Sequence, residues 1–109
     1  MKKNIVKDKS FQFSLEIIKL YQYLIKTKSE YILSKQVLRS GTSIGANIEE
    51  GLVAQSKKEF IAKLNISLKE AHETHYWLRL LKESGYINKD DLILRLFRVY
   101  YGFISNPPR

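Results

Sequence analysis

The sequence contains no cysteine, and its two prolines stand together at positions 107 and 108. The lack of cysteine excludes disulfide bonds and thiolate metal sites. No run reaches the roughly 20 apolar residues that a membrane-spanning helix needs, and no apolar stretch of a secretory signal follows the basic residues 1–10. We therefore expect a cytoplasmic protein.

Acidic residues are scarce relative to basic ones. The chain has 11 Asp and Glu against 19 Lys and Arg, which gives a formal net charge of +8. Such an excess attracts polyanions, and nucleic acid is the commonest partner of this kind. Lysines that only solvate helix surfaces would give a similar composition, so the charge alone leaves both interpretations open.

The apolar spacing predicts helices between the breaks that glycine, asparagine and serine supply. Four predicted helices cover about residues 10–26, 30–50, 56–82 and 88–106. Ser56 and Glu59 match a capping box at the start of the third helix. Gly51 suits a left-handed cap after the second helix, and Gly85 ends the third.

These helices lead us to expect one all-α domain, because 109 residues with 44% hydrophobic side chains suit a single soluble core. Short connections make consecutive helices antiparallel, so the predicted fold is an up-down-up-down four-helix bundle over residues 10–106. A basic, flexible tail of residues 1–9 is expected before it, and a short tail of residues 107–109 after it.

Two weak helix formers lie one turn apart in the second predicted helix, at Gly41 and Gly45. Each glycine costs a helix about 1 kcal/mol relative to alanine. A missing side chain allows a neighbouring helix to approach closer than the usual ~8–10 Å, and we predict that both glycines serve such close packing. A kink or irregular turn through residues 40–43 is the alternative.

A polar stripe borders the apolar face of the same predicted helix. Its members follow i, i+3, i+4 spacing: Gln36, Arg39, Ser43, Asn47 and Glu50. A hairpin with the third helix predicts an ion pair of Arg39 with Glu70 or Glu73, and it places Glu50 opposite Lys57 or Lys58. Ser43 and Asn47 are expected to hydrogen-bond to the third helix or to another chain. We interpret the stripe as a structural network that fixes register, with a site for a small polar ligand as the alternative.

Side chains for catalysis or metal binding are few. His72 and His75 are three residues apart, a spacing that can hold a metal, but the position of His75 on the predicted apolar face favours a hydrogen-bonded core residue. The chain has no Glu-x-x-His motif, no phosphate-binding glycine loop and no credible catalytic set. We expect no enzyme activity, no cofactor and no metal site; a ligand or metal site along Arg39, Asn47, Glu70 and His75 is an outlying alternative.

The predicted helices have more apolar surface than one bundle can bury. The first and fourth carry apolar residues on two adjoining faces, and the third adds a second stripe with Tyr76 and Trp77. Trp77, Phe97 and Tyr101 together favour self-association over a small bundle that leaves its aromatic residues exposed.

Two segments of the chain resemble a known family: LRSGTSIGANIEEG at residues 38–51 and SKKEFIAKLNISLKEAHETHYWLRLLKESGYI at residues 56–87. Both are similar to the four-helix-bundle proteins of intervening sequences in bacterial 23S rRNA genes, also called S23 ribosomal proteins. The resemblance extends over about residues 11–104. The chain departs from the family at Gly45, where Pro or Ala is frequent, and at Glu49, where Ala is common.

The resemblance implies a homo-oligomer, a ring of five bundles, without catalytic residues. The family is also similar to the accessory variability protein of diversity-generating retroelements, a basic pentamer that partners a reverse transcriptase and binds nucleic acid. We therefore expect a non-catalytic, pentameric protein that binds RNA or DNA; an adaptor that docks an enzyme such as a reverse transcriptase is the alternative. The expected nucleic-acid contacts are Lys2, Lys3, Lys7, Lys9, Arg95 and Arg98.

Overall fold

The structure, a computed structural model, describes residues 4–88, 93–95, 97, 98 and 102. This part of the chain is all helical, as predicted, and forms no strand. Its long helices are α1 (Ile5–Lys26), α2 (Leu33–Leu52) and α3 (Lys57–Glu83). Residues 93–95, 97 and 98, here called the C-terminal segment, are also helical and fall within the fourth predicted helix.

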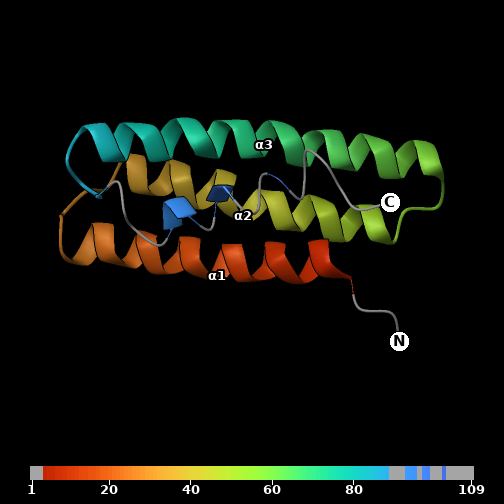
Figure 1. Cartoon of the computed structure of the whole chain (residues 1–109), viewed down its shortest axis with the longest axis horizontal. Helices are drawn as coiled ribbons and strands as arrows, with labels where there is room; N and C mark the ends of the chain where they lie inside the picture. The colour runs from red at the N-terminus through yellow and green to blue at the C-terminus, as the bar shows by residue number, and fades with distance from the viewer. Residues whose placement is uncertain (1–3, 89–92, 96, 99–101, 103–109) are drawn as a thin grey trace.

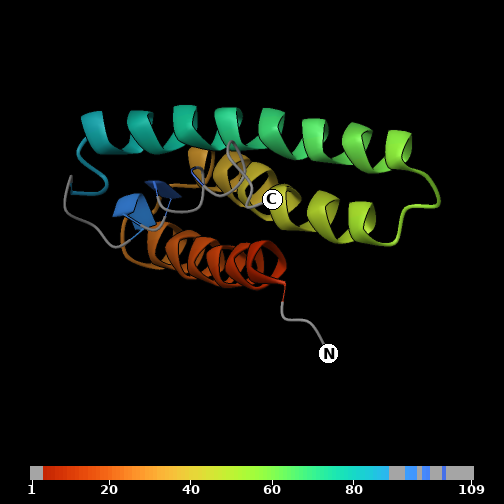
Figure 2. The same ribbon diagram turned by 45° about the vertical axis from the view of Figure 1, so that its right-hand side comes forward.

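The three long helices lie side by side, with α2 in contact with both α1 and α3. Figure 1 shows the chain reversing direction at each connection, and the turned view in Figure 2 keeps α2 between its two neighbours. None of the described helices is long and apolar enough to cross a membrane.

The first helix begins five residues earlier than predicted, so residues 5–9 are helical and do not belong to a flexible tail. Asn4 is the N-cap, and its side-chain oxygen accepts a hydrogen bond from the Lys7 backbone N–H at 2.9 Å. Val6 packs against the core, which anchors this extra turn. Ser10, the expected start of the helix, is fully buried, and its Oγ donates to the Lys7 carbonyl.

The second helix begins at Leu33, three residues after its predicted start, because Glu30 caps it from outside. The Glu30 carboxylate accepts hydrogen bonds from the backbone N–H groups of Ser34 at 2.7 Å, Leu33 at 3.0 Å and Ile32 at 3.2 Å. Burial by itself raises the pKa of Glu30, but the hydrogen bonds from these N–H groups outweigh it and hold the pKa below its ordinary value. The carboxylate also complements the positive end of the helix dipole.

Both ends of α3 follow the predicted local signals. Ser56 Oγ accepts a hydrogen bond from the Glu59 N–H at 3.1 Å, and the Glu59 carboxylate accepts one from the Gln55 N–H at 3.2 Å. At the other end Gly85 has a φ of 85°, and the N–H groups of residues 85 and 86 donate to the carbonyls of residues 82 and 81. This double closure is the Schellman motif, in which glycine tolerates the left-handed conformation.

Gly41 and Gly45 lie in an unbroken α2 and face α1, so the irregular turn is wrong and an added side chain at either position would meet α1. A Cβ added at Gly41 would lie 2.8 Å from side-chain carbons of the buried Ile17. One added at Gly45 would lie 3.3 Å from the backbone oxygen of Ser10. Gly51 also lies inside the helix and is no left-handed cap; its Cβ would lie 3.2 Å from the Cβ of Lys63 on α3.

Buried apolar side chains from the three helices, the turn after α3 and the C-terminal segment form one core. They are Phe13, Ile17, Leu20, Leu24, Val37, Ile44, Ile48, Ala71, Leu78, Leu81, Ile87, Ile93 and Phe97. Phe97 is buried and Trp77 packs against this core, so neither belongs to the spare apolar surface that the sequence suggested. Tyr101 lies outside the described residues.

Candidate functional site

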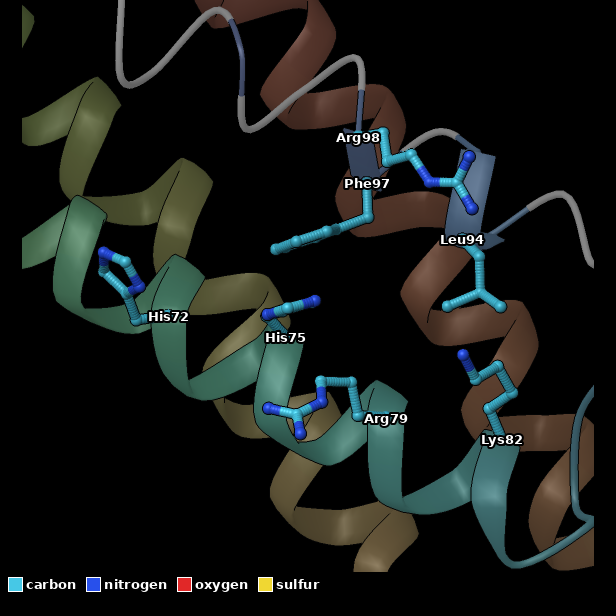
Figure 3. A pocket seen from close by; sticks show the side chains of 7 residues that line it. All are labelled: His72, His75, Arg79, Lys82, Leu94, Phe97 and Arg98. Carbon is cyan, nitrogen blue, oxygen red and sulfur yellow. The ribbon is translucent and has the colours of Figure 1, made fainter. Parts of the chain in front are cut away.

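A basic pocket of about 480 Å³ lies between α3 and the C-terminal segment. Its lining residues are His72, His75, Arg79, Lys82, Leu94, Phe97 and Arg98. Figure 3 shows the nitrogen-bearing side chains from both elements around this space. Among the described residues that line it, none is Asp or Glu.

Helix periodicity places the α3 residues of the pocket on one face. Positions 72, 75, 79 and 82 follow i, i+3, i+7 and i+10 spacing, so their side chains leave the helix in similar directions. The face is next to the buried one that contains Leu78, which explains how the pocket borders the core. The helical spacing of these four positions was therefore a signal for a basic face in the sequence. It was missed because His75 was interpreted as a core residue.

Phe97 holds the C-terminal segment against this face. Its ring stacks on His75 with centroids 5.5 Å apart and planes 3° apart, and it also packs against Phe13 of α1 at 5.8 Å. Only 5% of Phe97 is exposed, so it acts as an apolar anchor between α1 and α3. The anchor brings the neighbouring Arg98 to the pocket (Figure 3).

His75 is exposed and is not the buried core residue that the sequence suggested. Its partial desolvation lowers the pKa of the imidazole below the ordinary 6.5, and the nearby cationic groups Arg79, His72 and Lys82 lower it further. His75 is therefore mostly neutral near pH 7, and the permanent charge of the pocket comes from Arg79, Lys82 and Arg98.

The two arginines of the pocket have no carboxylate partner within ion-pair distance in the part of the chain that the structure describes. Lys82 lies 3.5 Å from Glu83, in an exposed pair that solvent screens. Unpaired guanidinium groups can bind phosphate or carboxylate through two parallel hydrogen bonds. The pocket thus has the chemistry of an anion site.

The described residues that line the pocket include no nucleophile beside a positioned base. His72 and His75 could each offer a ring nitrogen to a metal, but within residues 4–88, 93–95, 97, 98 and 102 no group of three His, Cys, Asp or Glu side chains comes together.

The predicted nucleic-acid contacts do not form one surface. Arg98 lines the pocket, and Arg95 is exposed on the same segment. Lys7 and Lys9 lie on the first turns of α1, beside Asp8 and Glu49, while Figure 1 shows the start of α1 and the end of α3 at opposite ends of the bundle. Lys2 and Lys3 lie outside the described residues.

Comparison with known proteins assigns the family. Residues 2–96 match the 23S rRNA-intervening sequence protein family. The chain belongs to that family. A crystal structure from Bacteroides thetaiotaomicron VPI-5482, described as a protein of unknown function from the S23 ribosomal protein family, has a TM-score of 0.88 and 48% sequence identity to it. The alignment covers 92% of this chain and 94% of that one, and no curated protein matches the chain.

In this member of the 23S rRNA-intervening sequence family, Arg39 forms the predicted ion pair. It pairs with both candidate partners, with Glu70 at 3.3 Å and also with Glu73. The pairs are largely exposed, since half of the Arg39 side chain is open to solvent, so they contribute little stability. Their alignment agrees with the register expected for a hairpin of α2 and α3.

The rest of the predicted polar network differs from expectation. Glu50 pairs with Lys63 at 2.9 Å and not with Lys57 or Lys58. Ser43 Oγ donates to the Arg39 carbonyl at 2.7 Å, and Asn47 Nδ2 donates to the Ser43 carbonyl at 2.8 Å, so both side chains bond within α2. A helical carbonyl four residues earlier is always within reach of such short side chains, and it competes with partners on other helices.

Buried hydroxyl groups, which the sequence analysis did not assign, connect α2 to α3. Ser67 Oγ donates to the Ile44 carbonyl at 2.9 Å, and Thr74 Oγ1 lies 2.9 Å from Ser40 Oγ. Ser40, Ser67 and Thr74 are fully buried. The available signal was the run of small residues at helical spacing in α3, namely Ser67, Ala71 and Thr74, on the face that packs against α2.

A stripe of exposed apolar residues runs along α1 on the side away from the core. Phe11, Leu15 and Ile18, here called the α1 stripe, follow i, i+4, i+7 spacing and are 54%, 40% and 39% exposed. This surface agrees with the apolar surplus that the sequence suggested for the first helix. A contiguous apolar surface of this kind is typical of an interaction site.

Proposed function

We propose that this protein is a non-catalytic RNA- or DNA-binding protein. The observation that carries the proposal is the basic pocket, which Arg79, Lys82 and Arg98 line together and to which the described residues add no carboxylate. The net charge of +8 supports it, because basic residues release counterions when they neutralise phosphates. Lys2, Lys3, Lys7, Lys9 and Arg95 are the further proposed contacts.

We also propose that the chain forms an up-down-up-down four-helix bundle that assembles into a homopentamer through the α1 stripe. A second copy that covers Phe11, Leu15 and Ile18 would remove their exposed apolar surface from water. A pentamer would also multiply the net charge of +8 fivefold, which favours multivalent contacts with one nucleic-acid strand.

Nucleic-acid binding is tested by fluorescence anisotropy with labelled structured RNA and with duplex DNA at low ionic strength. We expect binding that weakens steeply with salt, with a logarithmic slope of about −0.9 for each phosphate contacted on duplex DNA. The Arg95→Gln/Arg98→Gln variant should bind more weakly than Lys35→Gln/Lys69→Gln, which removes equal charge from exposed positions elsewhere. Lack of binding to either polymer at low salt would contradict the proposal.

The α1 stripe also supports the alternative, an adaptor that docks a partner enzyme such as a reverse transcriptase. Light scattering in solution separates the two roles of the stripe, because a pentamer has five times the 12.8 kDa mass of the chain. Leu15→Glu should dissociate that pentamer, whereas a protein that is a monomer before substitution favours the adaptor.

A further inference from the structure

We infer that the basic pocket is a discrete site for a nucleoside monophosphate group, either as a free nucleotide or as the phosphorylated end of a nucleic-acid strand. The inference rests on the proposed nucleic-acid binding and adds which part of the ligand the pocket receives. It stands on the cations, the ring surfaces and the size of the pocket.

The charge in the pocket exceeds what an internal phosphodiester requires. Arg79, Lys82 and Arg98 bring three permanent positive charges to one concave space. An internal phosphate carries a single negative charge, whereas a phosphomonoester carries about −1.5 to −2 at pH 7. A terminal phosphate therefore matches the pocket better than an internal one.

The guanidinium groups approach the pocket from two elements. Arg79 lies on α3 and Arg98 on the C-terminal segment, and Figure 3 shows both side chains with Lys82 around the same space. Each planar guanidinium group can bind two oxygens of a phosphate group through parallel hydrogen bonds.

The remaining lining suits a sugar and a base. Leu94 and Phe97 are apolar, and the exposed His75 ring is held parallel to Phe97 and offers a flat surface. Stacking of a base on an aromatic side chain contributes about 1–3 kcal/mol and does not depend strongly on sequence. The volume of about 480 Å³ falls in the range of small-ligand pockets, ~300–1,000 Å³.

Isothermal titration calorimetry with adenosine 5′-monophosphate tests the site, with adenosine as the ligand that lacks the phosphate. We expect micromolar to millimolar binding of the nucleotide and at least tenfold weaker binding of adenosine. Arg79→Gln should weaken nucleotide binding about tenfold, while Lys69→Gln, an exposed change on the same helix, should leave it unchanged. Equal binding of nucleotide and nucleoside, or equal effects of the two variants, would overturn the inference.

A second pair of ligands distinguishes a strand end from a free nucleotide. A labelled single-stranded 10-mer with a 5′-phosphate should bind more tightly than the same strand with a 5′-hydroxyl if the pocket receives strand ends. Binding of the nucleotide without a difference between the two strands assigns the pocket to free nucleotides. Strand binding that ignores the phosphate, together with no nucleotide binding, rejects the pocket inference but leaves the proposed nucleic-acid binding intact. Nucleotide binding without polymer binding supports the pocket inference and rejects the proposed nucleic-acid binding.

Discussion

Replacing Gly41 with alanine would insert a methyl group where α1 and α2 meet. The new Cβ would lie 2.8 Å from Ile17 Cδ1 and Cγ1 and 3.0 Å from Cγ2, which is closer than carbon atoms approach in folded proteins. Ile17 is fully buried and branched at Cβ, so its side chain has no open space into which to move. The substitution must shift a helix or strain a side chain.

Two opposing effects set how much Gly41→Ala changes the free energy of unfolding. Alanine is a better helix former than glycine by about 1 kcal/mol, and overpacking of a tight core costs about 1–3 kcal/mol. The contact at Gly41 involves three side-chain carbons, so we place the cost at the upper end and expect a net loss of ~1–2 kcal/mol. Without the packing constraint, the same change would stabilise the protein.

Urea unfolding followed by circular dichroism measures this difference, at one fixed protein concentration because association would shift the apparent stability. Ala46→Gly, at an exposed position in the same helix, gives the local propensity and should cost about 1 kcal/mol. In the double variant Gly41→Ala/Ile17→Ala, the methyl group added at position 41 would partly fill the cavity left by the truncated isoleucine. The double variant should therefore lose at least ~0.5 kcal/mol less than the sum of the single changes. A more stable Gly41→Ala, or strict additivity, would refute the close-packing argument.

Four other outcomes are expected. Glu30→Gln should lower the free energy of unfolding by about 1–2 kcal/mol in urea titrations at pH 7, because the charged cap of α2 is lost. Since the pKa of Glu30 is lowered on folding from 4.5, its contribution is present above pH 4.5 and is lost as the pH falls through the folded value, so wild type and variant should converge in acid. Thr74→Val should cost about 1–3 kcal/mol by the same assay, because it leaves the buried Ser40 hydroxyl without this partner; no loss would mean that the hydroxyl pair is unimportant. Arg39→Ala should cost less than about 1 kcal/mol and less still in 1 M salt, so a large salt-insensitive loss would contradict the exposed geometry. NMR titration should place the pKa of His75 below 6.5. The unfolded chain then binds more protons than the folded one, so His75 lowers the free energy of unfolding as the pH falls through 6.5. A pKa at or above 6.5 would contradict the cationic surroundings of His75.

Local signals predicted some boundaries of the helices and missed others. Ser56 and Gly85 were identified because capping depends on residues within a few positions, and no remote contact competes with them. Asn4 and Ser10 are both good N-cap residues, and local sequence cannot choose between them. The packing of Val6 on the core favours the earlier start, and it places Ser10 beside Gly45 inside the bundle.

The polar groups show the same division. The Arg39 ion pair followed from counting residues around a short hairpin, since antiparallel helices align distant positions at a fixed rise per residue. The side chains of Ser43 and Asn47 can donate a hydrogen bond either to a carbonyl of their own helix or to a group on another helix, with similar energies, and both bond within α2. A sequence pattern does not rank such alternatives, because the answer depends on distances of a few tenths of an ångström.

The sequence by itself determined the helices, the lack of membrane-length apolar runs, the excess positive charge and the need for a close helix contact at Gly41 and Gly45. These properties are set by spacing, side-chain chemistry and composition, which act over one or two helical turns. Only the tertiary structure decided that Phe97 lies between Phe13 and His75, and that Arg98 therefore lines the same pocket as Arg79. Those contacts depend on how each helix is rotated and which groove the C-terminal segment enters, and packing of the whole core selects both.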